Sequence, residues 1–169
     1  SPPQRRRRLA PRVSHDPREV LKAHGLWSKK HFGQNFLVAA DVPARIAAVG
    51  GVTAADTAFE IGAGVGTLTR ALAEIAGRVV ALEHDRDLVP LARSETAALS
   101  NVEVRRGDVL EVDWLALAAE LGPLVVYGNI PYNLSTSIVL GLLEARPAWT
   151  RVCLMVQREF AVRLAAPPG

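Results

Sequence analysis

The sequence predicts an α/β fold in which helices cover both faces of a doubly wound parallel sheet. Five short strand-like runs alternate with segments of helical pattern, and a glycine-rich turn follows the first run. Right-handed crossovers between such βα units place the strands in one parallel sheet. With 169 residues and 49% hydrophobic content, the chain is long enough to bury one sizeable core, so we expect one globular domain.

The N-terminal third contains the least regular part of this pattern. Residues 1–17 are rich in proline and arginine and predict a flexible basic arm, whereas 18–25 predict a short helix. A further helix is expected at 41–49, with an apolar face formed by Val42, Ile46 and Val49.

The regular βα alternation begins at residue 57. Strands are expected at 57–61, 78–82, 102–106, 124–128 and 151–156, and helices at 66–76, 87–99, 134–145 and 157–165, with a further helix at 111–121. In the first of these helices Leu68, Leu72 and Ile75 follow helical spacing, and Gly77 is a stop signal. Pro90 fits only a first helical turn, so the second helix is expected to begin near Asp87.

Composition narrows the cellular setting. The single cysteine, Cys153, excludes a disulfide framework, and no apolar run reaches the length of a membrane span. The arginines at 5–8 are not followed by an apolar segment, so no secretory signal is expected. These features predict a cytoplasmic protein without a membrane partner.

Positive charge is concentrated near the N-terminus. Residues 1–50 contain ten Lys and Arg against three Asp and Glu, whereas residues 51–169 contain ten against fourteen. Arg12, Lys29 and Lys30 are therefore candidates for binding RNA phosphates through counterion release. The alternative is a solvated leader that only keeps the chain soluble, and it applies most strongly to residues 5–8.

A glycine loop and two acids predict a nucleoside cofactor. Gly62, Gly64 and Gly66 follow the first strand, where a tight turn lets a ligand approach backbone N–H groups at a helix N-terminus. Thr67 stands where a dinucleotide fingerprint requires Gly or Ala. Glu83, after the second strand, suits two ribose hydroxyls. Asp108, after the third, suits an adenine amino group, and the Val109 N–H suits a ring nitrogen.

This order of groups fits S-adenosylmethionine best, because it provides for a ribose and an adenine but not for a pyrophosphate. Taken singly, Glu83 and Asp108 are also explained as surface charges or helix caps. No metal site is predicted.

The segment Asn129-Ile130-Pro131-Tyr132 predicts chemistry on a planar base. It follows an apolar strand, so its polar groups emerge at the carboxyl end, where open α/β sheets bind ligands. The N6 amine of adenine is a weak nucleophile because its lone pair is delocalised. The Asn129 oxygen and a carbonyl at Ile130 or Pro131 would localise that lone pair, while the Tyr132 ring stacks on the base. An ordinary strand-to-helix turn is the alternative.

Four motifs occur in the order typical of ribosomal RNA adenine dimethyltransferases. They are Phe-Gly-Gln-Asn-Phe-Leu at 32–37, Glu-Ile-Gly-Ala-Gly-Val-Gly-Thr-Leu-Thr at 60–69, Gly-Asn-Ile-Pro-Tyr-Asn at 128–133 and Met-Val-Gln-Arg-Glu-Phe-Ala-Val-Arg-Leu at 155–164. Residues 18–169 resemble this family, in particular the bacterial type that modifies the small ribosomal subunit.

The resemblance implies a Rossmann-like class I S-adenosylmethionine-dependent methyltransferase domain over 18–169, with strand order 3-2-1-4-5. It implies catalytic residues at Asn129, Ile130, Pro131 and Tyr132. The cofactor contacts that it implies are Gln34, Asn35, Leu37, Gly62, Gly64, Glu83, His84, Asp108, Val109 and Asn129.

The implied reaction is dimethylation of N6 in two adjacent adenosines of the 3′-terminal hairpin of small-subunit rRNA, on the immature 30S subunit, by a monomeric enzyme. Family members continue past the last residue here with an antiparallel strand pair and a helical RNA-binding domain. The expectation is therefore a catalytic domain truncated before that strand pair, with the 151–156 strand as a partly uncovered edge and weak or absent activity on RNA.

Two alternatives stay open from the sequence: a methyltransferase of large-subunit rRNA, and an assembly or RNA-binding factor without turnover. A small-molecule methyltransferase is disfavoured by the basic arm and the adenine-type loop.

Overall fold

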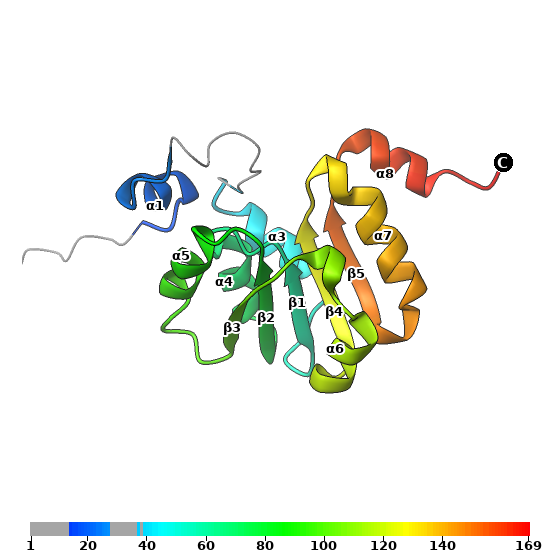
Figure 1. Ribbon diagram of the computed structural model, residues 1–169, viewed down its shortest axis with the longest axis horizontal. Coiled ribbons are helices and arrows are strands. Elements are labelled where there is room, and N and C mark those ends of the chain that lie inside the picture. The colour runs from blue at the N-terminus through cyan, green and yellow to red at the C-terminus, as the bar shows by residue number, and fades with distance from the viewer. Residues whose placement is uncertain (1–13, 28–36, 38) are drawn as a thin grey trace, which may run out of the picture.

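Five parallel strands form the central sheet of the computed structural model, which describes residues 14–27, 37 and 39–169. The strands are β1 (Thr57–Ile61), β2 (Arg78–Glu83), β3 (Val102–Arg106), β4 (Leu124–Asn129) and β5 (Trp149–Met155). Their order in the sheet is β3-β2-β1-β4-β5 (Figure 1). The predicted fold class and strand order are thus confirmed.

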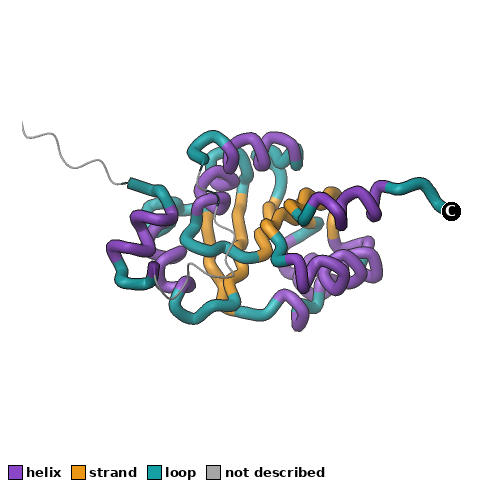
Figure 2. The backbone as a smooth tube through the Cα atoms, turned by 90° about the horizontal axis from the view of Figure 1, so that it is seen from above, coloured by secondary structure: helices purple, strands orange, loops and turns teal. Residues whose placement is uncertain are grey.

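Helices connect successive strands and cover both faces of the sheet, as Figure 2 shows from above. In chain order they are α1 (Pro17–Ala23), α3 (Val42–Val49), α4 (Thr67–Ala73), α5 (Leu88–Glu95), α6 (Trp114–Leu121), α7 (Ser135–Glu144) and α8 (Arg158–Ala165). Short 3-10 turns η1 (Val109–Glu111), η2 (Tyr132–Leu134) and η3 (Arg146–Ala148) complete the described elements.

Two hydrophobic layers hold the sheet between the helices. On one face Phe59, Leu82 and Val126 pack against α6 and α7, where the rings of Phe59 and Trp114 meet edge to face at 5.3 Å. An aromatic pair of this kind contributes about 0.5–1.5 kcal/mol beyond its buried area. On the other face, side chains of β1, β2 and β4 pack against α3 and α4. Strands β1, β2 and β4 therefore have apolar runs because both of their faces are buried.

Tyr127 ties the centre of the sheet to α3. Its side chain is fully buried; its hydroxyl donates to the Ala47 carbonyl at 2.7 Å and accepts the Val52 N–H at 3.3 Å. Burial raises the pKa of this phenol, so it stays a neutral donor. This tyrosine, in an otherwise aliphatic strand, thus holds the C-terminal end of α3 against β4.

The face predicted for α3 is confirmed at Ile46, which packs against the core, and wrong at Val49, which is 81% exposed; the buried residues of this helix are Pro43 and Ala47. Small residues form the buried side because α3 lies close to α4 and to Tyr127, and the sequence pattern counted only larger apolar side chains. Helix α5 also ends at Glu95, four residues before the predicted end.

Strand β5 and helix α8 differ from the rest of the sheet. All residues of β5 are at least partly exposed, as predicted for an edge strand, although the strand begins at Trp149 and not at 151. No residue of α8 is buried, and this helix projects from the body of the domain toward the C-terminal end (Figures 1 and 2). Within the part of the chain that the structure describes, no helix is long and apolar enough to cross a membrane.

Candidate active site

A cavity of about 690 Å³ opens at the carboxyl ends of β1 to β4. This position is where parallel α/β sheets bind ligands, because the strand order reverses between β1 and β4. The volume lies within the usual range for small-molecule sites, roughly 300–1,000 Å³. Of the predicted contacts, the cavity wall includes Leu37, Gly62, Gly64, Glu83, His84, Asp108, Val109 and Asn129.

The glycine loop between β1 and α4 forms the floor beside β2. Gly62, Gly64 and Gly66 have φ values of 81°, 58° and 87°, a region that disfavours side chains. The N–H groups of Gly62 and Ala63 both donate to the Leu82 carbonyl, at 2.8 and 2.9 Å. The tight turn is confirmed, but these amides hold the loop to β2 and are not left for a ligand.

Glu83 connects this loop to the end of β2. Its carboxylate accepts the Gly64 N–H at 2.6 Å and the Asp85 N–H at 2.9 Å, one on each oxygen. Burial raises the pKa of Glu83, and the two amide bonds partly oppose that rise. Because each carboxylate oxygen has a second lone pair, Glu83 still has acceptor capacity for two hydroxyl groups in the cavity.

Asp108 and Val109 form the wall after β3. One Asp108 oxygen accepts the Leu110 N–H at 2.9 Å and caps η1, which leaves the other oxygen as an acceptor. Among the described residues, none accepts the Val109 N–H. An acceptor and a donor on adjacent residues match the amino group and ring nitrogen of an adenine edge. His84 is exposed at the rim of the same cavity.

Asn129, the last residue of β4, lines the cavity from the opposite side. The preceding residue, Gly128, is closely packed: a Cβ there would lie 2.7 Å from Cδ1 of Ile130 and 3.1 Å from Cβ of Ile61, so both side chains would have to shift. Ile130 is buried, and its N–H donates to the Met155 carbonyl at 2.9 Å. The loop is therefore anchored to β5 directly after Asn129.

The structure distinguishes between the carbonyl groups of Ile130 and Pro131, which the sequence left as alternatives. The Pro131 carbonyl accepts both the Leu134 N–H at 3.0 Å and the Ser135 hydroxyl at 3.3 Å, so its two lone pairs are engaged. No described residue donates to the Ile130 carbonyl. Of the two carbonyl groups, that of Ile130 is thus the one without a donor among the described residues. Tyr132 is 72% exposed and lies outside the cavity wall, with its ring open to a partner.

Several predicted contacts lie outside the described residues: Gln34, Asn35, Lys29, Lys30 and Arg12. Their roles stay predictions.

Sequence reasoning assigned no role to Glu60, which the structure places in the cavity wall. Glu60 is 2% exposed, and its Oε2 accepts the Thr69 hydroxyl at 2.6 Å. Burial raises its pKa to about 8; the Thr69 hydrogen bond opposes this rise, and the charge of Glu83 adds to it. The available signal was a lone carboxylate inside an otherwise apolar strand, Thr57-Ala58-Phe59-Glu60-Ile61. Thr67, Leu134 and Ile138 also line the cavity and were not predicted.

Two solved structures with a similar fold are RNA methyltransferases. The crystal structure of the 23S rRNA methyltransferase ErmE matches with a TM-score of 0.68 and 32% identity, over 76% of this chain and 50% of that one. An RNA methyltransferase from Salinibacter ruber, in complex with S-adenosyl-L-homocysteine, matches with a TM-score of 0.51 and 25% identity, over 69% and 68% of the two chains. The fold and the site together define a Rossmann-like methyltransferase domain.

The sequence identifies the family within this class. Residues 26–169 match the family described as ribosomal RNA adenine dimethylase, and the chain belongs to that family. The ribosomal RNA small subunit methyltransferase A of Magnetococcus marinus is 48% identical over 151 residues, which are 89% of this chain and 54% of the relative. The chain thus spans about half the length of the curated relatives that it matches.

Proposed function

We propose that this chain contains the cofactor-binding and catalytic part of an enzyme that transfers methyl groups from S-adenosylmethionine to N6 of adenosines in small-subunit rRNA. One observation carries the proposal: the glycine loop, Glu83, Asp108 and Asn129 line one cavity beside the exposed ring of Tyr132. The name of the relative from Magnetococcus marinus supports small-subunit rRNA as the substrate.

The cavity has groups for the nucleoside part of the proposed cofactor. Acceptor oxygens of Glu83 suit the ribose hydroxyls, and Asp108 with the Val109 N–H suits the adenine edge. The bound S-adenosyl-L-homocysteine of the Salinibacter ruber neighbour supports this class of ligand. When bound, S-adenosylmethionine supplies an electrophilic methyl group.

The chain's own residues prepare the target amine. The Asn129 side-chain oxygen and the Ile130 carbonyl accept hydrogen bonds from the N6 amino group, so that the nitrogen lone pair is localised for attack on the methyl carbon. Tyr132 stacks on a base that has left its helix. The engaged Pro131 carbonyl and the Ile130 bond to β5 keep the loop in place, which reduces the reorganisation needed during the reaction.

Asn129→Ala in a full-length version, a chain that matches the relatives over their whole length, tests this mechanism. We expect the single-turnover rate on undermethylated small subunits to fall by about 10²–10³, the effect of losing one preorganised electrostatic group. The products are N6-methylated and N6,N6-dimethylated adenosine, measured by mass spectrometry of digested rRNA. Asn133→Ala, an exposed residue of η2 outside the cavity wall, should retain most of the rate. A parental rate for Asn129→Ala would contradict the amine-polarising role.

The similarity to ErmE supports a second candidate, methylation of an adenine in large-subunit rRNA. The same assay with large-subunit rRNA distinguishes the two substrates. Dimethylation confined to the small subunit supports the first proposal, and modification of 23S rRNA alone supports the second. Four points stay predictions: that the substrate is the immature 30S subunit, that the protein is a monomer, that the basic arm binds RNA, and that a domain boundary lies near residue 18.

A further inference from the structure

A buried carboxyl group at the floor of the cavity has one oxygen without a protein partner. Glu60 lies on β1, directly before the glycine loop, and Thr69 of α4 donates to its Oε2 at 2.6 Å. No described residue donates to Oε1. Because Glu60 lines the cavity and is 2% exposed, this oxygen is available to a bound molecule and almost inaccessible to bulk water.

Among the described residues, no cation offsets a negative charge at this position. The titratable groups that share the cavity wall are Glu83, His84, Asp85, Arg86, Arg106 and Asp108. Of these, the charge of Glu83 acts on Glu60, and it disfavours ionisation. His84, Arg86 and Arg106 are exposed at the rim. Burial, together with Glu83, raises the pKa of Glu60 to about 8, so the neutral acid predominates at pH 7.

The arrangement of Thr69 determines how the neutral acid is oriented. A threonine hydroxyl that donates to Oε2 leaves the acid proton on Oε1, the oxygen available to the cavity. An uncharged ligand group would leave this proton in place. A cationic group beside Oε1 would favour the carboxylate, because opposite charges attract strongly where water is excluded.

We propose that Glu60 is protonated in the empty cavity and releases its proton when a cationic group of the cofactor binds, so that cofactor binding is coupled to proton release. This inference rests on the proposed function, because S-adenosylmethionine carries two such groups, an ammonium and a sulfonium. The methyl transfer itself requires no change at Glu60, which acts in binding.

The coupling predicts a pH dependence of affinity with a defined sign. An acid with a pKa about 8 is roughly 90% protonated at pH 7, so binding there releases up to about 0.9 proton. Affinity should therefore rise by up to about tenfold per pH unit between pH 6 and 7, and the contribution of Glu60 should level off above pH 8. The cofactor's own amine also titrates in this range, so a comparison with a variant is required.

Calorimetry on the full-length version provides the test. S-adenosylmethionine is titrated into the parent and into Glu60→Gln, in buffers of different ionisation enthalpy at pH 6, 7 and 8. Glutamine keeps the shape and the acceptor for Thr69 but has no acid proton. We expect the parent to release up to about 0.9 proton more than Glu60→Gln at pH 7, and the variant to lose the matching rise in affinity. Equal proton release by the two proteins, with the cofactor bound by both, would overturn the inference and leave the proposed function intact.

Two further measurements identify the cationic group of the cofactor and test the role of Glu60 independently. S-adenosyl-L-homocysteine keeps the ammonium but lacks the sulfonium, so the same proton release with it assigns the contact to the ammonium, and reduced release assigns it to the sulfonium. Thr69→Val removes the hydrogen bond that stabilises the carboxylate, and should move the pH midpoint upward. An unchanged pH midpoint in Thr69→Val would contradict the proposed proton release from Glu60, even if Glu60→Gln failed to fold. Absence of cofactor binding by the parent would contradict the proposed function as well.

Discussion

The two halves of the sheet edge are built differently. On the β1 to β3 side, Glu60, Glu83 and Asp108 are each hydrogen-bonded within the protein, and the loop amides bind to β2. On the β4 to β5 side, Tyr132 is 72% exposed and α8 has no buried residue. In the first half, hydrogen bonds within the protein fix the positions of the cavity groups, as a small ligand of constant shape requires. The second half presents surface, as a large partner requires.

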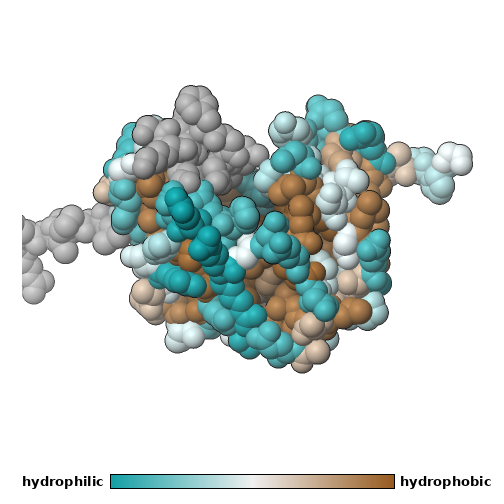
Figure 3. Space-filling view, in the orientation of Figure 1, coloured by the Kyte–Doolittle hydropathy of each residue, from teal (hydrophilic) through white to brown (hydrophobic). Residues whose placement is uncertain are grey.

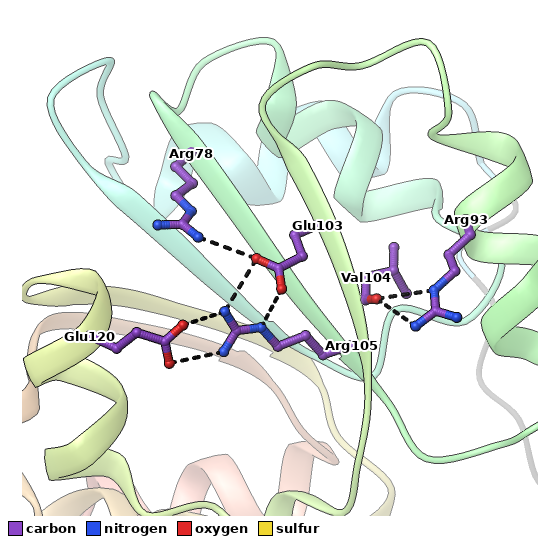
Figure 4. A network of polar contacts seen from close by, with 6 residues as sticks. All are labelled: Arg78, Arg93, Glu103, Val104, Arg105 and Glu120. Carbon is purple, nitrogen blue, oxygen red and sulfur yellow. Dashed lines mark hydrogen bonds and ion pairs between the residues drawn. The ribbon is translucent and has the colours of Figure 1, made fainter.

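The surface beyond β4 is also the more apolar one. Figure 3 shows hydrophobic surface gathered over α6 and α7, and Leu115, Leu140 and Leu143 are 54%, 54% and 56% exposed. The polar end is the β3 edge of the sheet, where Arg105 is bound by Glu103 of the same strand at 2.7 Å and by Glu120, near the C-terminus of α6, at 2.6 Å; Arg78 joins this network (Figure 4). Substitutions in the two halves should therefore affect different measurements.

The largest effect on stability is expected at Glu60, in the internally fixed half. Its pKa is raised from 4.5 to about 8, so the folded state keeps a proton that the unfolded chain loses. The free energy of unfolding should therefore fall as the pH rises from about 4.5 to about 8, by an amount on the order of a few kcal/mol, and change no further above it. Glu60→Gln should lack this loss. Urea unfolding of both proteins at pH 5, 7 and 9 measures the difference, and parallel pH profiles would contradict it.

Glu83→Ala should weaken S-adenosylmethionine binding by about 1–3 kcal/mol, the range for losing charge-assisted hydrogen bonds. The structure adds a second effect, because the N–H groups of Gly64 and Asp85 lose their acceptor and the free energy of unfolding falls too. Glu103→Ala is the matched control, since this carboxylate lies on β3 outside the cavity wall. Calorimetry that found equal affinities for the parent and Glu83→Ala would remove Glu83 from the cofactor site.

Tyr132→Ala tests the exposed half. Loss of the stacking ring should cost about 1–3 kcal/mol of productive RNA binding, without a change in cofactor affinity. Tyr132→Phe keeps the ring and should be mild. Binding and single-turnover rates of the full-length version measure both. If Tyr132→Phe were as impaired as Tyr132→Ala, the hydroxyl and not the ring face would carry the role.

The smallest effect is expected from Glu120→Gln at the polar end. The Arg105 hydrogen bonds lower the pKa of Glu120, but the side chain is 53% exposed and solvent screens the pair. The urea midpoint and the cofactor affinity should stay at the parental values. A clear loss of either would show that the network in Figure 4 supports the site.

The sequence predicted those features that depend on chain order. The convergence of Gly62, Glu83, Asp108 and Asn129 follows from βα units in a parallel sheet, because successive carboxyl ends then lie along one edge. The strand order 3-2-1-4-5 was implied by the family resemblance. In helix α3 the prediction failed at Val49, since the contacts of this helix depend on Tyr127, which is distant in sequence. The same limit applies to Glu60, whose state depends on Thr69, Glu83 and the depth of the cavity.

The sequence pattern also could not predict which carbonyl groups of the loop are already hydrogen-bonded within the protein. Nothing in the segment Asn129 to Tyr132 indicates that the Pro131 carbonyl is engaged by Leu134 and Ser135, whereas no described residue donates to the Ile130 carbonyl. Such a choice is made by three-dimensional geometry within a single turn. Motif spacing identifies the loop, but it does not identify which carbonyl oxygen is left without a donor.

The pairing of β1 with β4 affects how the chain folds during synthesis. Strand β1 binds β2 on one side, but its other edge pairs with β4, which is made only after β3 and α6. Until then, the edge of β1 exposes unpaired backbone groups next to apolar side chains. Contacts between distant segments form slowly, so this interval is when association with other chains competes most strongly. Emergence of Leu124 to Asn129 closes the edge, and the same step brings Asn129 to the cavity.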